Sequence, residues 1–479
     1  MLRIRLLITL LLISRLSFSQ ESALQKFLSD SSMIHASVSL CIKDADSGNS
    51  ISEYDPGKSL IPASVLKLIT SGVALELLGP HHKFRTILGY TGTLNRRTGR
   101  LSGNIVIRGG GDPTLGSEYF MDNYKDFLAV WVTEIKKAGI KKVDGRIITD
   151  DTYYDFIPVS PKWQREDIGN YYGAGVYGLS VYDNTAEIHL KTADEQSPVL
   201  MTGINPKEYM YEFENRLSAY GTSDEGYVQS EPYSTHGSLT GTIPVKQEDF
   251  ILKASIADPP LFIAGLLNDS LKASGLKIKE EPSTYRLSMK NLNDKVNILS
   301  EITSPPLSDL IEVLNHESVN LYAETLLKEL GKAYRNNGST DSGLVVVKEF
   351  FRNTNIPSDG LFIEDGSGLS PRNAISSENL VSFLCYMRNN GKYFAEYFKS
   401  LPEAGKNGTL RSYFRDPVFE GRMNAKSGSM TRVRCYAGYL VTNSDRQIAF
   451  SILVNNYSGS SQKVISGIEG IIKEIILYK

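Results

Sequence analysis

Apolar and polar residues follow a helical spacing near the start of the chain. Residues 21–28 have the pattern of a short amphipathic helix, and residues 34–42 alternate in the manner of a strand. An apolar helix then begins at Pro62 and ends at Gly79-Pro80, because proline suits the first turn of a helix and glycine followed by proline ends one.

Residues 84–285 have a different pattern. Helical periodicity becomes rare, and short alternating runs are separated by glycine-rich turns such as residues 109–113. The pair Pro259-Pro260 marks a joint. We interpret this stretch of about 200 residues as a β-rich insertion of two modules, the second nested within the first near residues 168–257.

The helical pattern returns after Pro305. The spacing predicts helices over residues 307–314 and 320–330, and then two alternating strands over residues 431–442 and 447–455. A final helix over residues 464–477 has a continuous apolar stripe. Such a stripe fits either a membrane surface or a sheet, and we expect it to pack against the sheet.

The first twenty residues have the pattern of a secretory signal peptide. Arg3 and Arg5 precede an apolar run at residues 6–13, and small polar residues follow it. The run is shorter than the ~20 residues that a membrane-spanning helix needs. We therefore expect an exported protein with no transmembrane helix in its mature chain. The alternative is an amphipathic leader that stays attached, which Arg15 favours by its position close to the expected cleavage point.

Composition narrows the class of protein. The 479 residues are 41% hydrophobic and 22% charged, with 52 Lys+Arg against 54 Asp+Glu. Such a chain can bury a core, and its near-neutral charge argues against a nucleic-acid partner. Cys41, Cys385 and Cys435 allow at most one disulfide bridge, whose pairing stays open. No Cys/His spacing typical of a metal site occurs, so no metal is expected.

The first candidate for chemistry is Ser64-x-x-Lys67. Three residues apart on a helix, the two side chains share one face, where a lysine of lowered pKa could deprotonate the serine. The same spacing recurs at Ser274 and Ser460, and only Ser64 lies at the start of an apolar helix that would bury its lysine. The plainer interpretation is a helix-start serine beside a solvated lysine.

Two further motifs follow in order along the chain. Ser318-Val319-Asn320 could place a hydroxyl and an amide in one cleft, or Ser318 could simply cap the next helix. Lys426-Ser427-Gly428 suits an edge strand on which a substrate docks as an added strand, the cation and hydroxyl binding a carboxylate. The alternative for this motif is an exposed strand edge protected by its lysine.

The order of the three motifs resembles that of penicillin-binding proteins and class A β-lactamases, whose motifs are S-x-x-K, S-D-N and K-T-G. The 254 positions from Ser64 to Ser318 are too many for a compact β-lactamase. The chain is therefore similar to class C low-molecular-mass penicillin-binding proteins, the D-alanyl-D-alanine carboxypeptidase/endopeptidase family of serine peptidases. Residues 109–115, 258–260 and 365–370 support the resemblance, which covers essentially the whole mature chain.

The resemblance implies an α+β fold, in which a serine-transpeptidase or β-lactamase-like domain is interrupted by two β-rich modules. The predicted parts are a signal peptide, the first part of the transpeptidase-like domain, the first part of domain II, domain III, the rest of domain II and the rest of the transpeptidase-like domain. Their boundaries are 1–20, 21–83, 84–167, 168–257, 258–288 and 289–479.

The resemblance also implies a hydrolase that needs no cofactor and acts on peptidoglycan stem peptides ending in D-Ala-D-Ala, with β-lactams as covalent inhibitors and no nucleic-acid partner. The expected location is the periplasm or cell envelope. The implied catalytic residues are Ser64 as nucleophile, Lys67 as base and Ser318 as proton relay. The implied substrate-binding residues are Asn320, Lys426, Ser427, Gly428 and, through its backbone N–H in the oxyanion hole, Ser429.

Three details qualify these expectations. Val319 stands where the second motif usually has Asp or Asn, which removes a polar group from the relay. Lys426 is expected to keep Lys67 uncharged by repulsion. Asp167, after Trp163 in the insertion, is a candidate for binding the free amine of a peptide side chain.

Two other functions stay open: an inactive relative that binds peptidoglycan or a β-lactam, which Val319 would favour, and a β-lactamase or esterase on the same scaffold.

Overall fold

The computed structural model describes residues 22–477 except 125, 210 and 289–294. The predicted signal peptide lies outside the described residues. Within the described part, no helix combines the length and apolar character that crossing a membrane requires.

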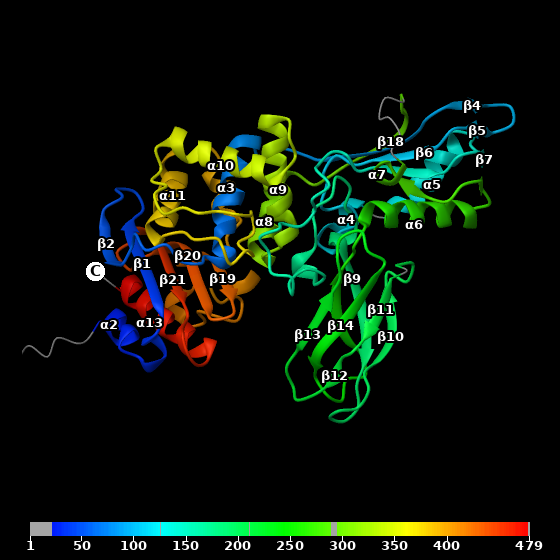
Figure 1. The fold of residues 1–479 in the computed structure, drawn as a ribbon. Coiled ribbons are helices and arrows are strands. Elements are labelled where there is room, and N and C mark those ends of the chain that lie inside the picture. Colours follow the sequence, from blue (N-terminus) through cyan, green and yellow to red (C-terminus); the bar gives the residue numbers. More distant parts are fainter. Residues whose placement is uncertain (1–21, 125, 210, 289–294, 478–479) are drawn as a thin grey trace, which may run out of the picture.

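The two ends of the chain form one antiparallel sheet of five strands, ordered β19-β20-β21-β1-β2 (Figure 1). Its strands are β1 (Ser37–Asp44), β2 (Ser50–Tyr54), β19 (Met423–Met430), β20 (Val433–Val441) and β21 (Gln447–Asn455). β1 pairs with β21 along its whole length, from Ser37 opposite Asn455 to Asp44 opposite Ile448. This pairing brings the first and third motifs into the same half of the molecule, and it leaves β19 at the sheet edge.

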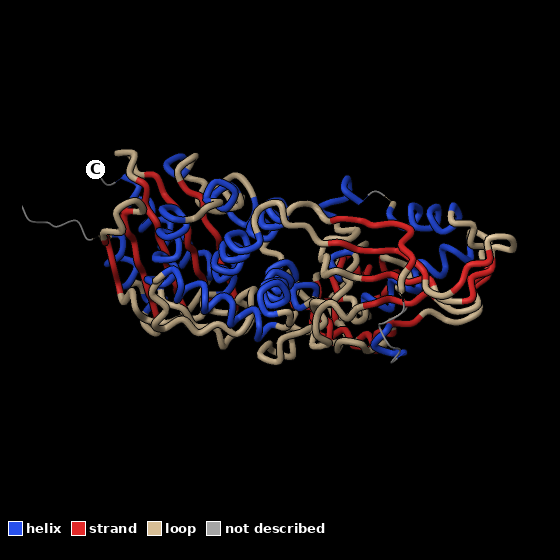
Figure 2. Tube along the Cα trace, turned by 90° about the horizontal axis from the view of Figure 1, so that it is seen from above, coloured by secondary structure: helices blue, strands red, loops and turns tan. Residues whose placement is uncertain are grey.

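Helices cover both faces of this sheet, as the view from above in Figure 2 shows. Alternate strand residues enter different cores, because successive side chains of a strand point to opposite faces. Cys435 and Leu453 join the core beneath the larger group of helices, whereas Tyr436 and Ile452 join the core beneath α13. The helices of this half are α2 (Ala23–Leu28), α3 (Lys67–Leu78), α8 (Leu307–Glu317), α9 (Asn320–Arg335), α10 (Thr340–Thr354), α11 (Ser377–Asn390), α12 (Phe394–Lys399) and α13 (Ser461–Leu477).

The apolar stripe of α13 packs on the sheet, which confirms the expectation from its spacing. Val464, Ile468 and Ile472 are each 0% exposed and belong to the same core as the strand residues Tyr436 and Ile452. The stripe is therefore buried inside the protein and is not free to lie on a membrane.

The first part of the insertion contains two neighbouring sheets, ordered β17-β8-β6-β3-β18 and β16-β7-β5-β4. The strands of the first are β3 (Arg85–Tyr90), β6 (Ile105–Arg108), β8 (Ile147–Asp150), β17 (Ser283–Thr284) and β18 (Asn297–Thr303). The strands of the second are β4 (Thr93–Asn95), β5 (Arg100–Ser102), β7 (Lys142–Val143) and β16 (Lys277–Ile278). The helices of this part are α4 (Met121–Tyr124), α5 (Phe127–Lys137), α6 (Pro259–Ala273) and α7 (Tyr285–Ser288).

The sequence pattern did not predict α5 and α6. Asp258 caps α6 by accepting a hydrogen bond from the Leu261 N–H, and the Pro259-Pro260 pair occupies the first helical positions. Proline is well tolerated there because those N–H groups have no intrahelical partner. The proline pair thus begins a helix at the point where the sequence indicated a joint.

The nested part of the insertion is almost entirely β. It consists of a sheet ordered β10-β9-β15 and a second sheet in which β14 pairs with β11, β12 and β13. Their strands are β9 (Thr185–Lys191), β10 (Leu200–Asn205), β11 (Glu212–Asn215), β12 (Ser218–Ala219), β13 (Glu225–Gln229), β14 (His236–Ile243) and β15 (Phe250–Ser255). They enclose a small core around Ile188, Leu239 and Leu252.

The domain boundaries stay a prediction, and one strand pairing bears on them. β18 pairs antiparallel with β3 in the inserted sheet, although residues 297–303 lie beyond the predicted boundary at 288. The pairing favours a boundary nearer Ser304, whose backbone N–H donates to the carbonyl of Phe84 at 3.0 Å.

Candidate active site

Ser64 lies in a short 3₁₀ turn, η2 (Ala63–Leu66), that leads directly into α3. The predicted helix therefore begins as a tighter turn, and the backbone N–H of Lys67 donates to the Ser64 carbonyl. Ala63 has a φ of 46°, so the chain enters the turn through a left-handed residue. The turn places the Lys67 Nζ 2.8 Å from the Ser64 Oγ, which is the contact expected from the spacing.

The ammonium nitrogen of Lys67 is surrounded by oxygen acceptors. Besides Ser64 Oγ, it contacts Asn320 Oδ1 at 2.6 Å and the Ser367 carbonyl oxygen at 2.8 Å. The side chain is 0% exposed. Burial lowers the pKa of Lys67 to about 7, and the negative charges of Asp365 and Glu324 act in the opposite direction.

The cause of this lowered pKa differs from the expected one. The sequence suggested repulsion by Lys426, whereas desolvation of Lys67 itself is the main cause. Lys426 is also fully buried, and burial followed by repulsion from Lys67 lowers its pKa well below the usual lysine value. The repulsion between the two lysines therefore lowers the pKa of Lys426 and not that of Lys67.

The second motif lies at the junction of α8 and α9. Ser318 has left-handed backbone angles, φ 61° and ψ 35°, and α9 begins two residues later at Asn320. The capping alternative for Ser318 is wrong, because Val319 occupies the N-cap and no side chain caps this helix. Ser318 Oγ instead accepts a hydrogen bond from Lys426 Nζ at 2.9 Å.

Asn320 connects the lysine to the insertion. Its Oδ1 accepts from Lys67, and its Nδ2 donates to the carbonyl oxygen of Tyr172 at 2.8 Å. The amide orientation follows from this network, since only its oxygen can accept from an ammonium group. Val319 lines the cavity and packs partly against the core. Its side chain takes no part in the hydrogen bonds of Lys67, Ser318 and Asn320 given above.

The third motif lies within the edge strand β19, which agrees with the edge strand suggested for it but lies outside the expected strands over residues 431–442 and 447–455. The alternative of a solvent-exposed lysine is wrong, because Lys426 is 0% exposed and donates to Ser318 Oγ and to the Ser427 carbonyl, each at 2.9 Å. Ser427 Oγ donates to Thr409 Oγ1 at 2.8 Å. Gly428 faces the turn of Ser64 so closely that a Cβ would lie 2.6 Å from the Pro62 carbonyl oxygen and 3.1 Å from the Ser64 nitrogen.

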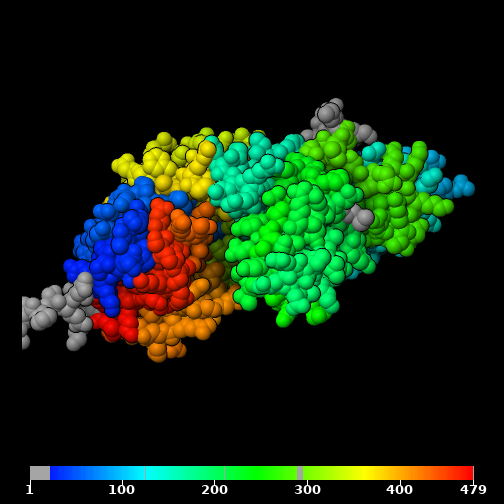
Figure 3. All heavy atoms as spheres, turned by 60° about the horizontal axis from the view of Figure 1, so that its bottom comes forward, coloured from blue at the N-terminus to red at the C-terminus, as the bar shows by residue number. Residues whose placement is uncertain are grey.

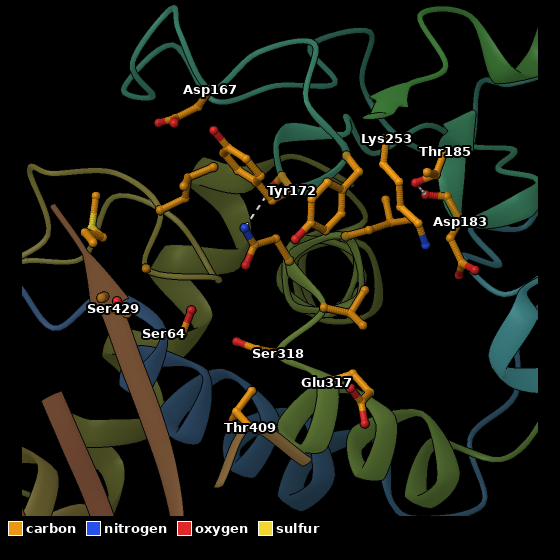
Figure 4. Close-up of a pocket in the computed structure, with 18 of the residues that line it drawn as sticks. Ser64, Asp167, Tyr172, Asp183, Thr185, Lys253, Glu317, Ser318, Thr409 and Ser429 are labelled. Atoms are coloured by element: carbon orange, nitrogen blue, oxygen red, sulfur yellow. Dashed lines mark hydrogen bonds between the residues drawn. The ribbon is translucent and has the colours of Figure 1, made fainter. Parts of the chain in front are cut away.

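A cavity of about 1230 Å³ opens in front of these groups, between the main sheet and the insertion (Figure 3). In the close-up, Ser64, Ser318 and Ser429 surround one end, Asp167 lies on a loop above them, and Asp183 and Lys253 lie at the opposite end (Figure 4). The cavity lining includes Ser64, Asp167, Tyr172, Asp183, Lys253, Glu317, Ser318, Asn320, Thr409 and Ser429.

Sequence reasoning missed three residues that hold this arrangement. Thr409 was missed because no pattern around it marks a site. Glu324 and Asp365 were not assigned a role, although they are buried and act electrostatically on Lys67. The segment of residues 365–370 supported the family resemblance. It was the signal that could have identified Asp365, but the sequence does not show that this segment contacts Lys67.

The geometry is suited to nucleophilic catalysis. A neutral lysine has two N–H donors and one lone pair. With Asn320 Oδ1 and the Ser367 carbonyl accepting the two hydrogens, the lone pair of a neutral Lys67 faces the Ser64 hydroxyl at 2.8 Å. A lysine with a pKa of about 7 spends much of its time in that neutral form at neutral pH.

Comparison with known proteins agrees with this geometry. The model of the D-Ala-D-Ala carboxypeptidase 3 (S13) family matches residues 20–473. The chain belongs to this family. It is 28% identical over 451 residues to a D-alanyl-D-alanine carboxypeptidase of Actinomadura sp. strain R39, covering 90% of this chain and 80% of that protein.

Two further relatives extend the comparison. A penicillin-sensitive carboxypeptidase A of Dictyostelium discoideum is 26% identical over 454 residues, covering 88% of this chain and 82% of that protein. The crystal structure of penicillin binding protein 4 from Haemophilus influenzae has the same fold, with a TM-score of 0.80 at 21% identity over 92% of this chain and 97% of that one. These matches confirm the α+β fold and the family that the three motifs indicated.

The S13 chain should lose most of its activity on replacement of Gly428 by alanine. The new Cβ would lie against the Pro62 carbonyl and the Ser64 nitrogen, so β19 must move away from the nucleophile turn. A displacement of about 1 Å can reduce a rate by ~10²-fold. The measurement is release of D-alanine from a peptide ending in D-Ala-D-Ala.

Gly470→Ala is the control for this substitution, because a Cβ at Gly470 on α13 meets nothing within 4 Å. It should keep the wild-type rate. Wild-type release of D-alanine by Gly428→Ala would contradict the tight fit of β19 against the turn.

Proposed function

We propose that this protein is a serine-type D-Ala-D-Ala carboxypeptidase and DD-endopeptidase that cleaves peptidoglycan stem peptides through an acyl-enzyme on Ser64. The observation that carries the proposal is the contact of Lys67 Nζ with Ser64 Oγ at 2.8 Å inside a buried network. The family places the chain among D-Ala-D-Ala carboxypeptidases, and the network supplies a nucleophile with its base.

Acylation begins with the transfer of a proton from Ser64 to Lys67. Neutral Lys67 takes the hydroxyl proton of Ser64, and the Oγ attacks the carbonyl carbon between the two D-alanine residues. The backbone N–H groups of Ser64 and Ser429 stabilise the negative charge that develops on the carbonyl oxygen. The C–N bond then breaks, and the terminal D-alanine leaves as an amine.

The leaving amine takes the hydroxyl proton of Ser318, and the proton that Lys67 took from Ser64 is passed on to Ser318, so that Lys67 is neutral again before the second step. Ser318 Oγ accepts from Lys426 Nζ, so the hydroxyl hydrogen of Ser318 is free to point to the cavity. Lys426 and Ser427 bind the terminal carboxylate, and Asn320 binds the acyl side of the substrate. A water molecule, activated by the same base, hydrolyses the ester and restores Ser64. No metal or cofactor takes part in these steps.

One carboxylate of the cavity lining, on the loop above the serines, suits an amine of the substrate. One oxygen of Asp167 is buried and has no hydrogen-bond partner among the described residues. Burial raises the pKa of Asp167 to about 6, which a bound ammonium group would reverse. We assign Asp167 to the free side-chain amine of the stem peptide.

Export to the periplasm or cell envelope completes the proposal. Residues 1–20 have the signal-peptide pattern, and peptidoglycan lies outside the cytoplasm. β-Lactams are the expected covalent inhibitors, since their acyl-enzyme would form on the same serine. The Dictyostelium relative, named for its sensitivity to penicillin, supports this part of the proposal.

Fluorescent penicillin should label the full chain covalently, and Ser64→Ala should abolish the labelling. The chance copy of the motif provides a matched control, because Ser460 precedes the exposed Lys463 by the same spacing. Ser460→Ala should be labelled like the wild type. Labelling that survives in Ser64→Ala would remove the proposed nucleophile, and labelling without D-alanine release would favour the inactive, binding relative.

The acylation rate should rise with pH through a midpoint near 7. The lowered pKa of Lys67, about 7, means that the protonated, inactive form prevails below this pH and the neutral base above it. The measurement is the second-order rate constant for acylation by benzylpenicillin, followed by intact mass. A rate that increased only near the ordinary lysine value of 10.5 would contradict the proposed base.

Asp167→Asn should raise KM at least ~10-fold for a stem peptide with a free side-chain amine, because a charge-assisted pair is lost. It should leave KM unchanged for the same peptide with that amine acetylated. Glu166→Gln serves as control, since Glu166 lines the same cavity but is exposed. Equal effects of Asp167→Asn on both peptides would refute the amine-binding role.

A further inference from the structure

Helix α9 carries a buried carboxylate one turn beyond Asn320. Glu324 Oε1 accepts hydrogen bonds from the backbone N–H of Gly366 at 3.0 Å and of Ser367 at 2.7 Å, and its Oε2 accepts from Gly366 at 3.1 Å. The carbonyl of that same Ser367 accepts from Lys67 Nζ at 2.8 Å. The carboxylate and the lysine are therefore bound to the same short segment of backbone.

We propose that Glu324 is a positioning residue for the reaction, which fixes the Ser367 carbonyl against Lys67 and whose charge governs the proton on that lysine. The inference rests on the proposed function, because it takes Lys67 as the base that activates Ser64. It adds a residue outside the three motifs to the groups on which that base depends.

The segment is held from its other side by Asp365. Its Oδ1 accepts from the Gly368 N–H at 2.8 Å, and its Oδ2 accepts from the Ser370 N–H at 2.6 Å and from Trp163 Nε1 at 2.9 Å. Thr70, on α3 one turn after Lys67, donates its hydroxyl to the Gly366 carbonyl at 2.6 Å. Glu324 is thus the link between this segment and the helix that carries Asn320.

A carboxylate suits the geometry at Glu324. Its Oε1 accepts from the N–H groups of both Gly366 and Ser367, and its Oε2 shares the Gly366 N–H. A glutamine would keep the volume and could keep both bonds to Oε1, but its NH₂ group would replace Oε2 and face the Gly366 N–H. The substitution therefore removes the second acceptor for Gly366 and the negative charge together.

The charges that face this cluster come from five segments of the chain, one of them in the insertion. Glu324 and Lys328 lie on α9, Asp365 on the loop between α10 and α11, Lys67 on α3 and Lys426 on β19. Asp155, from the insertion, accepts from Lys328 Nζ at 2.6 Å.

The two carboxylates act on the lysine in one direction. Asp365 and Glu324 both raise the pKa of Lys67 against the effect of burial. Burial and the neighbouring Asp365 raise the pKa of Glu324 itself, while the N–H groups of Gly366 and Ser367 favour its charged form. Burial lowers the pKa of Lys67, and the Glu324 charge partly offsets this effect. Removal of that charge should therefore lower the pKa of Lys67 further.

The test compares wild-type protein, Glu324→Gln and Glu329→Gln as full chains. Glu329 is a matched control because it is also buried on α9, at 3% exposure, but contacts Tyr153 and Tyr154 away from the lysine. The measurement is the second-order rate constant of acylation by benzylpenicillin, by intact mass, from about pH 5 to 9.

In Glu324→Gln, the midpoint of the rise in rate should move to lower pH by about one unit, since a nearby opposite charge shifts a pKa by about this amount or more. The plateau rate should fall by about tenfold or more, because the Ser367 carbonyl is less well held. Glu329→Gln should keep the wild-type midpoint. A midpoint that stays at its wild-type pH in Glu324→Gln would overturn the proposal, even if the plateau falls.

Glu324→Asp keeps the proposal testable if Glu324→Gln does not fold. It retains the charge on a shorter side chain, so the plateau should fall about tenfold while the midpoint stays at the wild-type pH. A wild-type plateau in Glu324→Asp would also overturn the proposal. Absence of any acylation of Ser64 in the wild-type protein would instead refute the proposed function, so the two failures are distinguishable.

Discussion

The site depends on the burial of one cation. Lys67 is completely enclosed, and an ammonium group without water is costly unless it is paired or loses its proton. The surrounding structure provides three oxygen acceptors and two carboxylates farther off, which together keep the group near the boundary between its charged and neutral forms. A lysine in that condition can take a proton from a neighbouring hydroxyl and give it back, which a solvated lysine at neutral pH does poorly.

The fold achieves this burial with segments far apart in the sequence. The enclosing groups come from η2 and α3, from the start of α9, from the loop around residue 367 and from β19. The pairing of β1 with β21 closes the sheet between the two ends of the chain, so the edge strand β19 lies directly against the turn of Ser64. A long insertion between the first two motifs is compatible with this arrangement, because the insertion extends away from the sheet on one side (Figure 1).

The three motifs could be predicted because their order along the chain is more specific than any one of them. Each motif alone has chance copies or a plain structural explanation. In the structure, the lysines of the proposed site are buried, whereas the lysine of a chance copy is exposed. Lys463, in a chance copy, is exposed and pairs with Asp30, whereas Lys67 and Lys426 are enclosed. The helices that begin at the first two motifs were also predicted, since their apolar spacing is regular, whereas the strand β19 that carries the third motif was not.

The parts that could not be predicted depend on contacts between distant segments. Nothing local marks Thr409 as the partner of Ser427, or Glu324 as the acceptor for the amides of residues 366 and 367. Helices α5 and α6 were missed because the glycine-rich turns around them favoured strands and because a proline pair can begin a helix as well as interrupt one. The reason for the lowered pKa of Lys67 was also misjudged, since desolvation is a property of the folded interior alone.

The contacts of the insertion have a consequence for how the protein can be divided. Asn320 donates to the Tyr172 carbonyl, Trp163 donates to Asp365, and Tyr154 donates to Glu329. Excising the inserted residues to obtain a minimal enzyme would remove all three hydrogen bonds and open Asn320 and Asp365, which lie around Lys67, to water. The insertion is therefore one wall of the cavity beside Ser64, and it cannot be removed without changing the surroundings of Lys67.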